Sequence, residues 1–78
     1  KNSNATVLKK GQMAQISDIN IEEIPLKLIE MGCLPGNTIE LIQVAPMGDP
    51  LFFNINDSKV EKKKKTAQEI YILQESIQ

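Results

Sequence analysis

Residues 28–41 read LIEMGCLPGNTIEL, an amphipathic segment followed by a turn and then by a run of β-forming residues. Gly32 can adopt the left-handed conformation that commonly ends a helix. Pro35 and Gly36 occupy the centre of a tight turn. Residues 38–45 are rich in β-branched side chains and contain no breaker, so they predict the strongest strand of the chain. The middle of the sequence therefore predicts a helix, a turn and a strand in that order.

The start of the helix has two alternatives. Asn20 can cap a first turn, with Glu23 three residues later as in a capping box. The apolar residues would then share one face of a helix over residues 20–32, namely Ile21, Ile24, Leu28 and Met31. Pro25 opposes this long helix, because an interior proline removes a hydrogen bond and clashes with a preceding carbonyl. A helix that begins at Pro25 avoids both penalties, and residues 20–24 would then form a separate turn.

The flanking segments predict four further strands. Residues 13–19 carry β-branched residues at useful places, and residues 51–55 alternate so that three large apolar side chains share one face. Asn56-Asp57-Ser58 is a turn sequence, so the chain returns antiparallel after it, and residues 70–73 form the last strand. Five short strands, with one short helix between the first and second, predict an all-β fold. Because closure removes exposed sheet edges, we expect a small closed barrel.

The composition narrows the class of protein. The chain has 78 residues, which is one domain (residues 1–78), and 41% of them are hydrophobic, which favours a folded chain over a disordered one. Nine lysines, no arginine and ten carboxylates give a net charge of −1, so nucleic acid is not an expected partner. No apolar run approaches the roughly 20 residues that span a bilayer, so direct membrane insertion is not expected. No signal peptide is visible either, and a cytoplasmic location is predicted.

The first six residues are expected to lie outside the fold. The chain begins with Lys1 rather than Met, and Ser3-Asn4-Ala5 resembles the scar that protease cleavage of an expression tag leaves. We therefore expect residues 1–6 to be tag-derived or disordered.

The residues that usually carry catalysis are missing from the sequence. There is no His, so the commonest general base and metal ligand are both absent. Cys33 has no second Cys and no His with which to form a nucleophilic pair or a zinc site, so we interpret it as a small, half-buried residue after the helix. Met47 and Cys33 together offer too few ligands for a dedicated soft-metal site. The sequence predicts no catalytic residue, no metal site and no cofactor.

Two motifs resemble those of the FeoA family. Residues 28–41 are similar to the family's helix, Leu-Pro-Gly turn and strand, and residues 44–51 resemble its Ala-Pro-x-Gly-Asp-Pro loop. Ala67, Ile70 and Ile72 are similar to the closing Ala-x-x-Ile-x-Val pattern. The resemblance implies a five-stranded SH3-like barrel. The sequence departs from the family at Lys62, where an apolar Leu is usual before the closing strand.

The resemblance also implies a function. A FeoA-like chain would be a non-enzymatic cytoplasmic accessory protein of ferrous iron uptake, a transition-metal transport process. Its expected partner is FeoB, a membrane transporter of ferrous iron, through either the cytosolic GTP-binding region or the membrane part. The same barrel also occurs as an SH3-like regulatory domain of iron-dependent transcriptional repressors, which is the alternative. Weak self-association is a further open question.

Apolar residues near the helix and in one loop are the candidate contacts with a partner. Leu26 and Ile29 lie off the stripe that faces the core, and they predict an outward patch together with the turn after the helix. The predicted partner-binding residues are Leu26, Ile29, Met31, Cys33, Leu34 and Met47. The lysines of residues 62–65 either blunt a strand edge or guide an acidic partner towards the domain.

Overall fold

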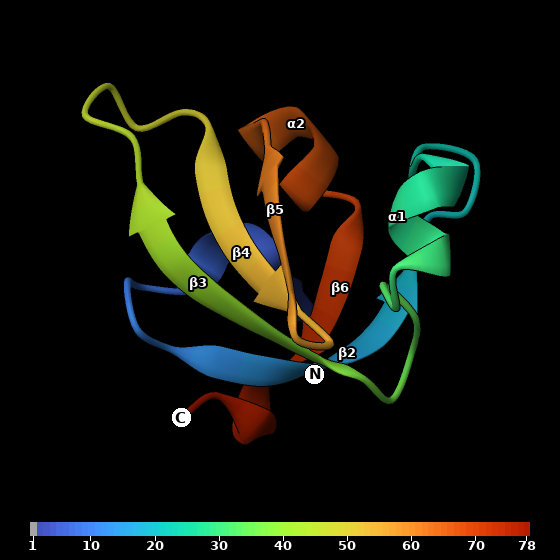
Figure 1. Cartoon of the computed structure of the whole chain (residues 1–78). Helices are drawn as coiled ribbons and strands as arrows, with labels where there is room; N and C mark the ends of the chain where they lie inside the picture. The colour runs from blue at the N-terminus through green and yellow to red at the C-terminus, as the bar shows by residue number, and fades with distance from the viewer. Residues whose placement is uncertain (1) are drawn as a thin grey trace.

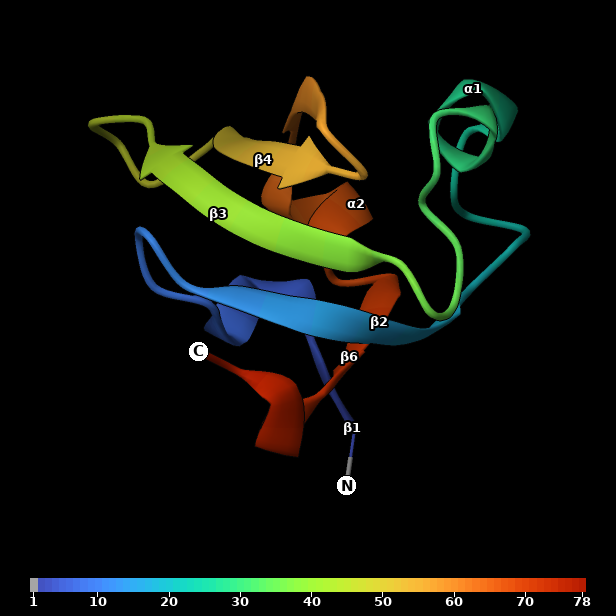
Figure 2. The same cartoon turned by 60° about the horizontal axis from the view of Figure 1, so that its bottom comes forward.

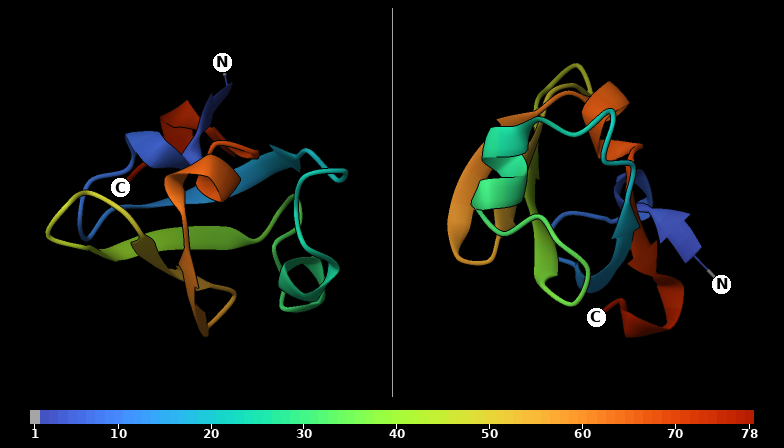
Figure 3. Two further views of the ribbon diagram at one scale, coloured as in Figure 1. Left: turned by 90° about the horizontal axis from the view of Figure 1, so that it is seen from above. Right: turned by 90° about the vertical axis from the view of Figure 1, so that its right-hand side faces the viewer.

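In the computed structural model, which describes residues 2–78, six strands form one antiparallel sheet in the order β1-β6-β2-β3-β4-β5 (Figure 1). The strands are β1 (Asn2–Asn4), β2 (Met13–Ile19), β3 (Thr38–Val44), β4 (Leu51–Ile55), β5 (Ser58–Lys62) and β6 (Ile70–Leu73). β2 is the corner of the sheet, because its first residues pair with β3 and its later residues pair with β6. The sheet therefore curls around one core, as the end-on view shows (Figure 3).

The prediction of an all-β fold is confirmed, but the predicted number of strands is wrong. The additional strand is β1, whose Asn2–Asn4 backbone pairs with β6 within residues that we expected to be tag-derived or disordered. Ala5 follows it and is fully buried. The expectation that residues 2–6 are disordered is therefore wrong, whereas their origin in a tag stays a prediction, and Lys1 lies outside the described residues. The sequence of β1, Asn-Ser-Asn, lacks the alternation of apolar residues that indicates a strand. Its pairing with β6 uses backbone groups, which every sequence has, so nothing in the sequence indicated this strand.

Closure of the barrel also differs from the prediction. Within residues 2–78, β1 and β5 are the two ends of the strand order, and no ladder joins them. In the same part of the chain, three short helical turns connect the strands or follow the last one. They are η1 (Ala5–Val7), α2 (Lys64–Ala67) between β5 and β6, and η2 (Gln74–Ser76). Figure 2 shows the barrel from below, with the chain ends on the same side as β6.

The helix α1 (Leu26–Glu30) lies between β2 and β3, the first two strands that the sequence predicted. It begins directly after Pro25, which confirms the shorter of the two alternatives. Residues 20–24 form a separate turn, closed by a hydrogen bond from Ile24 N to Asn20 O (3.1 Å). Because the turn interrupts the helical periodicity, Ile21 is 69% exposed instead of lying on the buried face.

The core lies between the two halves of the curled sheet. Alternation along the strands buries every second residue, most regularly in β4, where Leu51, Phe53 and Ile55 point inward. Ile24 and Leu28 cover one end of this core from α1 and the turn before it. The residues with no measurable exposure are Ala5, Ile16, Cys33, Ile39, Phe53, Ile55, Ala67, Ile70 and Ile72.

A close backbone approach fixes α1 against the sheet. Gly32, directly after the helix, has a φ of +111°, and a Cβ atom there would lie 2.6 Å from the Cβ of Asn56. Asn56 and Asp57 both have positive φ and form the two-residue turn between β4 and β5. Asn37 Nδ2 also donates a hydrogen bond to the carbonyl oxygen of Gly32 (2.8 Å). The end of α1, the β4–β5 turn and the start of β3 are thereby held together.

We expect Gly32→Ala to lower the free energy of unfolding by roughly 3 kcal/mol, because the new Cβ adds a steric clash to a strained backbone conformation. Gly11→Ala is the matched control, since Gly11 has a φ of +88° but nothing within 4 Å of its Cβ position. Gly11→Ala should lower stability by only about 1 kcal/mol. Urea unfolding of both variants measures the difference.

A second variant distinguishes the effect of the steric clash with Asn56 from the effect of the positive φ at position 32. Asn56→Gly removes the side chain that the new methyl group would meet, so it should restore part of the loss in the Gly32→Ala background. Equal losses in Gly32→Ala and Gly11→Ala, with no restoration by Asn56→Gly, would show that the close approach does not matter for stability.

Candidate functional site

Three of the exposed apolar side chains lie on α1 or in the turns that flank it. Among the described residues, seven large apolar side chains are exposed: Val7, Met13, Ile21, Leu26, Leu34, Val44 and Met47. Ile21, Leu26 and Leu34 lie within fourteen residues of one another on the segment that contains α1. Their exposed fractions are 69%, 68% and 41%. We call these three residues the α1 surface.

The local fold explains why the α1 surface faces outward. Ile24 and Leu28 are buried on the opposite side and attach the helix to the core. The turn before Pro25 and the close approach at Gly32 fix both ends of the helix. Leu26 is therefore presented on a short, well-anchored helix, and Ile21 and Leu34 lie in the turns before and after it.

The structure places the other predicted contact residues differently. Ile29 and Met31 are half-buried, and Ile29 packs against the core, so both lie at the margin of the α1 surface. Cys33 is fully buried, so its side chain is not available to a partner, and it is removed from the predicted site. The sequence predicted a half-buried Cys33. No local pattern of residues indicates that the chain at Gly32 packs closely against Asn56, which is far away in the sequence.

Met47 is the most exposed large apolar residue, at 93%, but it lies in a different place. Its loop connects β3 and β4 and extends from the end of the molecule opposite α1 (Figure 1). The structure therefore does not bring Met47 together with Leu26 and Leu34. Ile21, by contrast, was missed in the sequence because it was assigned to the buried helical face. The break at Pro25 is the signal that could have revealed it.

Among the predicted contact residues, only Cys33 has an ionisable side chain. Burial raises the pKa of the Cys33 thiol from its ordinary value of 9.0 to about 11, so the thiol is protonated at neutral pH. Within residues 2–78, no group of three or more His, Cys, Asp or Glu side chains could hold a metal ion. No helix in this part of the chain is both long and apolar enough to cross a membrane. The α1 surface is distinguished by its three exposed apolar side chains, which alternate with the exposed charged residues Glu22, Glu23, Lys27 and Glu30.

Comparisons with known proteins agree with this architecture. The family model for the FeoA domain matches residues 5–73. The zinc complex of FeoA from Stenotrophomonas maltophilia, described as an SH3 domain protein, superposes with a TM-score of 0.82 at 16% identity. That match covers 96% of this chain and 94% of the other. The iron(II) transport protein A from Clostridium thermocellum superposes with a TM-score of 0.74 at 31% identity, covering 92% of this chain and 46% of the other.

A curated relative joins two kinds of sequence. The Fe(2+) transport protein A/Fe(2+) transporter FeoB fusion protein of Porphyromonas gingivalis is 35% identical over 46 residues, which are 59% of this chain. The matched part spans only 6% of that relative. The fold thus defines a small SH3-like domain. The chain belongs to the FeoA domain family.

Burial of the Cys33 thiol predicts how the free energy of unfolding depends on pH. In the unfolded chain Cys33 titrates near 9.0, while in the folded protein its pKa is about 11. Between these values the unfolded state releases its proton first, so rising pH favours unfolding, and the contribution of Cys33 is complete only below pH 9.0. We expect the free energy of unfolding to fall less steeply over this range in Cys33→Ala than in the natural chain.

Urea unfolding at several pH values measures this difference, and the variant shares every other titrating group with the natural chain. Alkylation by iodoacetamide in the folded state should also be slow, because the thiolate is the reactive form. Equal pH slopes for the two proteins, together with rapid alkylation of the folded chain, would contradict a buried Cys33.

Proposed function

We propose that this chain is a non-enzymatic accessory domain that binds a FeoB-type ferrous iron transporter in the cytoplasm and modulates it. The observation that carries the proposal is the α1 surface, where Leu26 on α1 and Ile21 and Leu34 in the flanking turns expose apolar side chains. Clustered exposed apolar side chains on a small domain mark sites of protein–protein contact. A domain with this surface and no catalytic constellation is suited to binding another protein.

The fusion relative supports the choice of partner. In Porphyromonas gingivalis, a sequence similar to part of this chain and a sequence of the FeoB transporter belong to one polypeptide. Covalent linkage raises the effective concentration of one domain near the other, so it favours even a weak contact. A separate accessory domain must reach the same contact by affinity alone, and an exposed apolar surface is one way to supply that affinity.

The size of the α1 surface predicts a moderate affinity. Burying one exposed leucine side chain contributes roughly 1.5–3 kcal/mol at most, and much of that gain is offset by the loss of translational and rotational freedom. Three such side chains are too few for a permanent complex. A reversible contact is the kind of interaction that a transport cycle can switch on and off.

Leu26→Ser combined with Leu34→Ser should weaken binding to the cytosolic GTP-binding region of the cognate transporter by about tenfold or more. These two residues are chosen because both are exposed, whereas Ile29 packs against the core and its replacement would also lower stability. The measurement is an NMR titration of the labelled domain, once with GDP and once with a GTP analogue on the transporter region. Chemical shift changes should concentrate on residues 21–34.

The matched control is Val7→Ser combined with Val44→Ser. These residues are also exposed apolar side chains, at 48% and 38%, but they lie away from α1 on η1 and at the end of β3. The control should bind as the natural chain does. If both double variants weaken binding equally, the α1 surface is not the contact. If the natural chain binds neither the GTP-binding region nor the membrane part of the transporter, the proposed function is wrong and the repressor alternative gains support.

A further inference from the structure

Among the described residues, the outer edge of β5 pairs with no other strand, and the proposed function gives this edge no role. Within the described residues, β4 is the one element that β5 contacts extensively, and β5 ends the strand order. Figure 1 shows it in front of the barrel with β4 on one side. An unpaired strand edge exposes a row of backbone N–H and C=O groups that can pair with another strand.

The register identifies which backbone groups are free. The two-residue turn at Asn56 and Asp57 makes Ile55 and Ser58 a hydrogen-bonded pair. Along β5, hydrogen-bonded and non-hydrogen-bonded positions then alternate, so Val60 and Lys62 direct their backbone groups towards β4. Lys59 and Glu61 direct theirs away from the sheet. Neither takes part in a backbone hydrogen bond outside the strand pairing.

Positive charge is concentrated in β5 and directly after it: Lys59 and Lys62 lie in β5, and Lys63, Lys64 and Lys65 follow at the start of α2. Residues 59–65 contain five of the nine lysines and one of the ten carboxylates, which gives this segment a charge of +4. The other residues carry four lysines and nine carboxylates, or −5, so the net charge of −1 conceals a strongly divided surface. Within residues 2–78, none of these five lysines forms an ion pair. The positive charge is therefore available to an external carboxylate.

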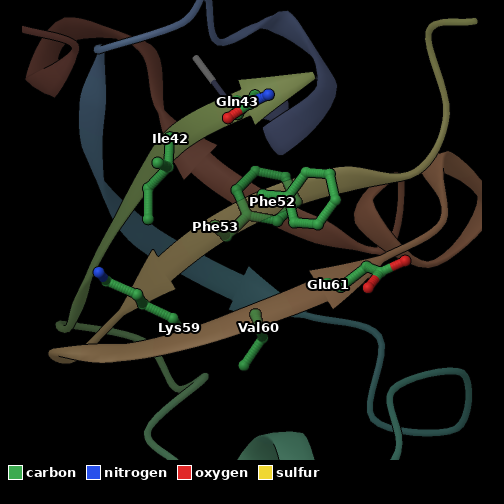
Figure 4. Close-up of a pocket in the computed structure, with 7 residues that line it drawn as sticks. All are labelled: Ile42, Gln43, Phe52, Phe53, Lys59, Val60 and Glu61. Atoms are coloured by element: carbon green, nitrogen blue, oxygen red, sulfur yellow. The ribbon is translucent and has the colours of Figure 1, made fainter. Parts of the chain in front are cut away.

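Two hollows flank the edge and share Glu61. One has a volume of about 280 Å³ and is lined by residues of three adjacent strands, including the half-buried Ile42 and Phe52 (Figure 4). The other has a volume of about 330 Å³ and is lined by Asp49, Pro50, Glu61 and Lys63. The lining of the first hollow is mainly apolar, and that of the second combines Lys63 with the carboxylates Asp49 and Glu61.

We propose that the β5 edge binds an extended, acidic peptide segment of another protein as an additional strand of the sheet. The free backbone groups of Lys59 and Glu61 provide the strand pairing. The lysines of residues 59–65 select for carboxylates on the segment. This inference goes beyond the proposed function, since it concerns a different surface and does not depend on which protein carries the segment.

The same charges disfavour a second copy of this chain as the occupant. Pairing β5 with β5 would place two strands of charge +1, each followed by three further lysines, about one strand spacing apart, roughly 4.8 Å, which is well inside the Debye length at physiological salt. Lysines on a strand edge thus prevent self-pairing while they admit an acidic strand. A nucleic acid or a lipid headgroup would use the lysines but leave the outward backbone groups of β5 unpaired.

The test uses the whole chain and a capped synthetic peptide in which glutamate and valine alternate. In the free protein, the amide hydrogens of Lys59 and Glu61 should exchange with solvent quickly, while those of Val60 and Lys62 are protected by pairing with β4. On addition of the peptide, the protection of Lys59 and Glu61 should rise by about tenfold. A peptide in which lysine and valine alternate should produce no such change.

Two pairs of variants separate backbone pairing from charge. Lys63→Gln with Lys65→Gln should weaken peptide binding by about tenfold, whereas Lys9→Gln with Lys10→Gln removes the same charge elsewhere and should have little effect. Glu61→Pro removes one outward N–H group and should weaken binding. Glu61→Gln removes the same negative charge but keeps that N–H group, and should bind as well as the natural chain or better.

The outcomes are distinct. Peptide binding that shifts lysine signals without protecting Lys59 and Glu61 would overturn the strand-addition proposal, even if Glu61→Pro fails to fold. So would dimerisation of the natural chain through β5, or binding to anionic vesicles or oligonucleotides with no response to the acidic peptide. Loss of the contact at the α1 surface would leave this proposal standing, and the reverse also holds, because the two experiments use different residues and different ligands.

Discussion

The close approach of Gly32 to Asn56 is the constraint on which the arrangement of the surface depends. A residue with a side chain at position 32 would push the end of α1 away from the β4–β5 turn, since its Cβ would lie 2.6 Å from that of Asn56. The hydrogen bond from Asn37 to the Gly32 carbonyl ties the same point to the start of β3. One backbone position therefore sets the place of the helix, the hairpin turn and the following strand.

The strands could be predicted because their burial alternates. β2, β4 and β6 occupy the residues expected from the sequence, and β3 ends one residue earlier, at Val44. The rest could not be predicted, for identifiable reasons. β1 pairs through its backbone and carries no apolar pattern, and Ile21 is exposed because Pro25 breaks the helical phase. The depth of Cys33 depends on contacts between segments far apart in the chain, which local spacing does not encode.

Two surfaces of different chemistry result from this fold. The α1 surface is apolar and depends on the Gly32 junction for its position, whereas the β5 edge is cationic and depends on the open end of the strand order. An apolar contact contributes affinity, and a charged edge contributes association rate and selectivity. A small domain with both features can bind a partner at one surface and hold an extended segment at the other. The Gly32–Asn56 junction places the end of α1 next to the turn that leads into β5.

The central claim is that the α1 surface contacts a FeoB-type transporter. Its most direct test is hydrogen exchange mass spectrometry of this domain, alone and with the full-length transporter in detergent or nanodiscs. We expect slower exchange in peptides that cover residues 21–34, while peptides covering β1 and η2 exchange as in the free domain. Unchanged exchange throughout the domain, or protection confined to β1 and η2, would contradict this account.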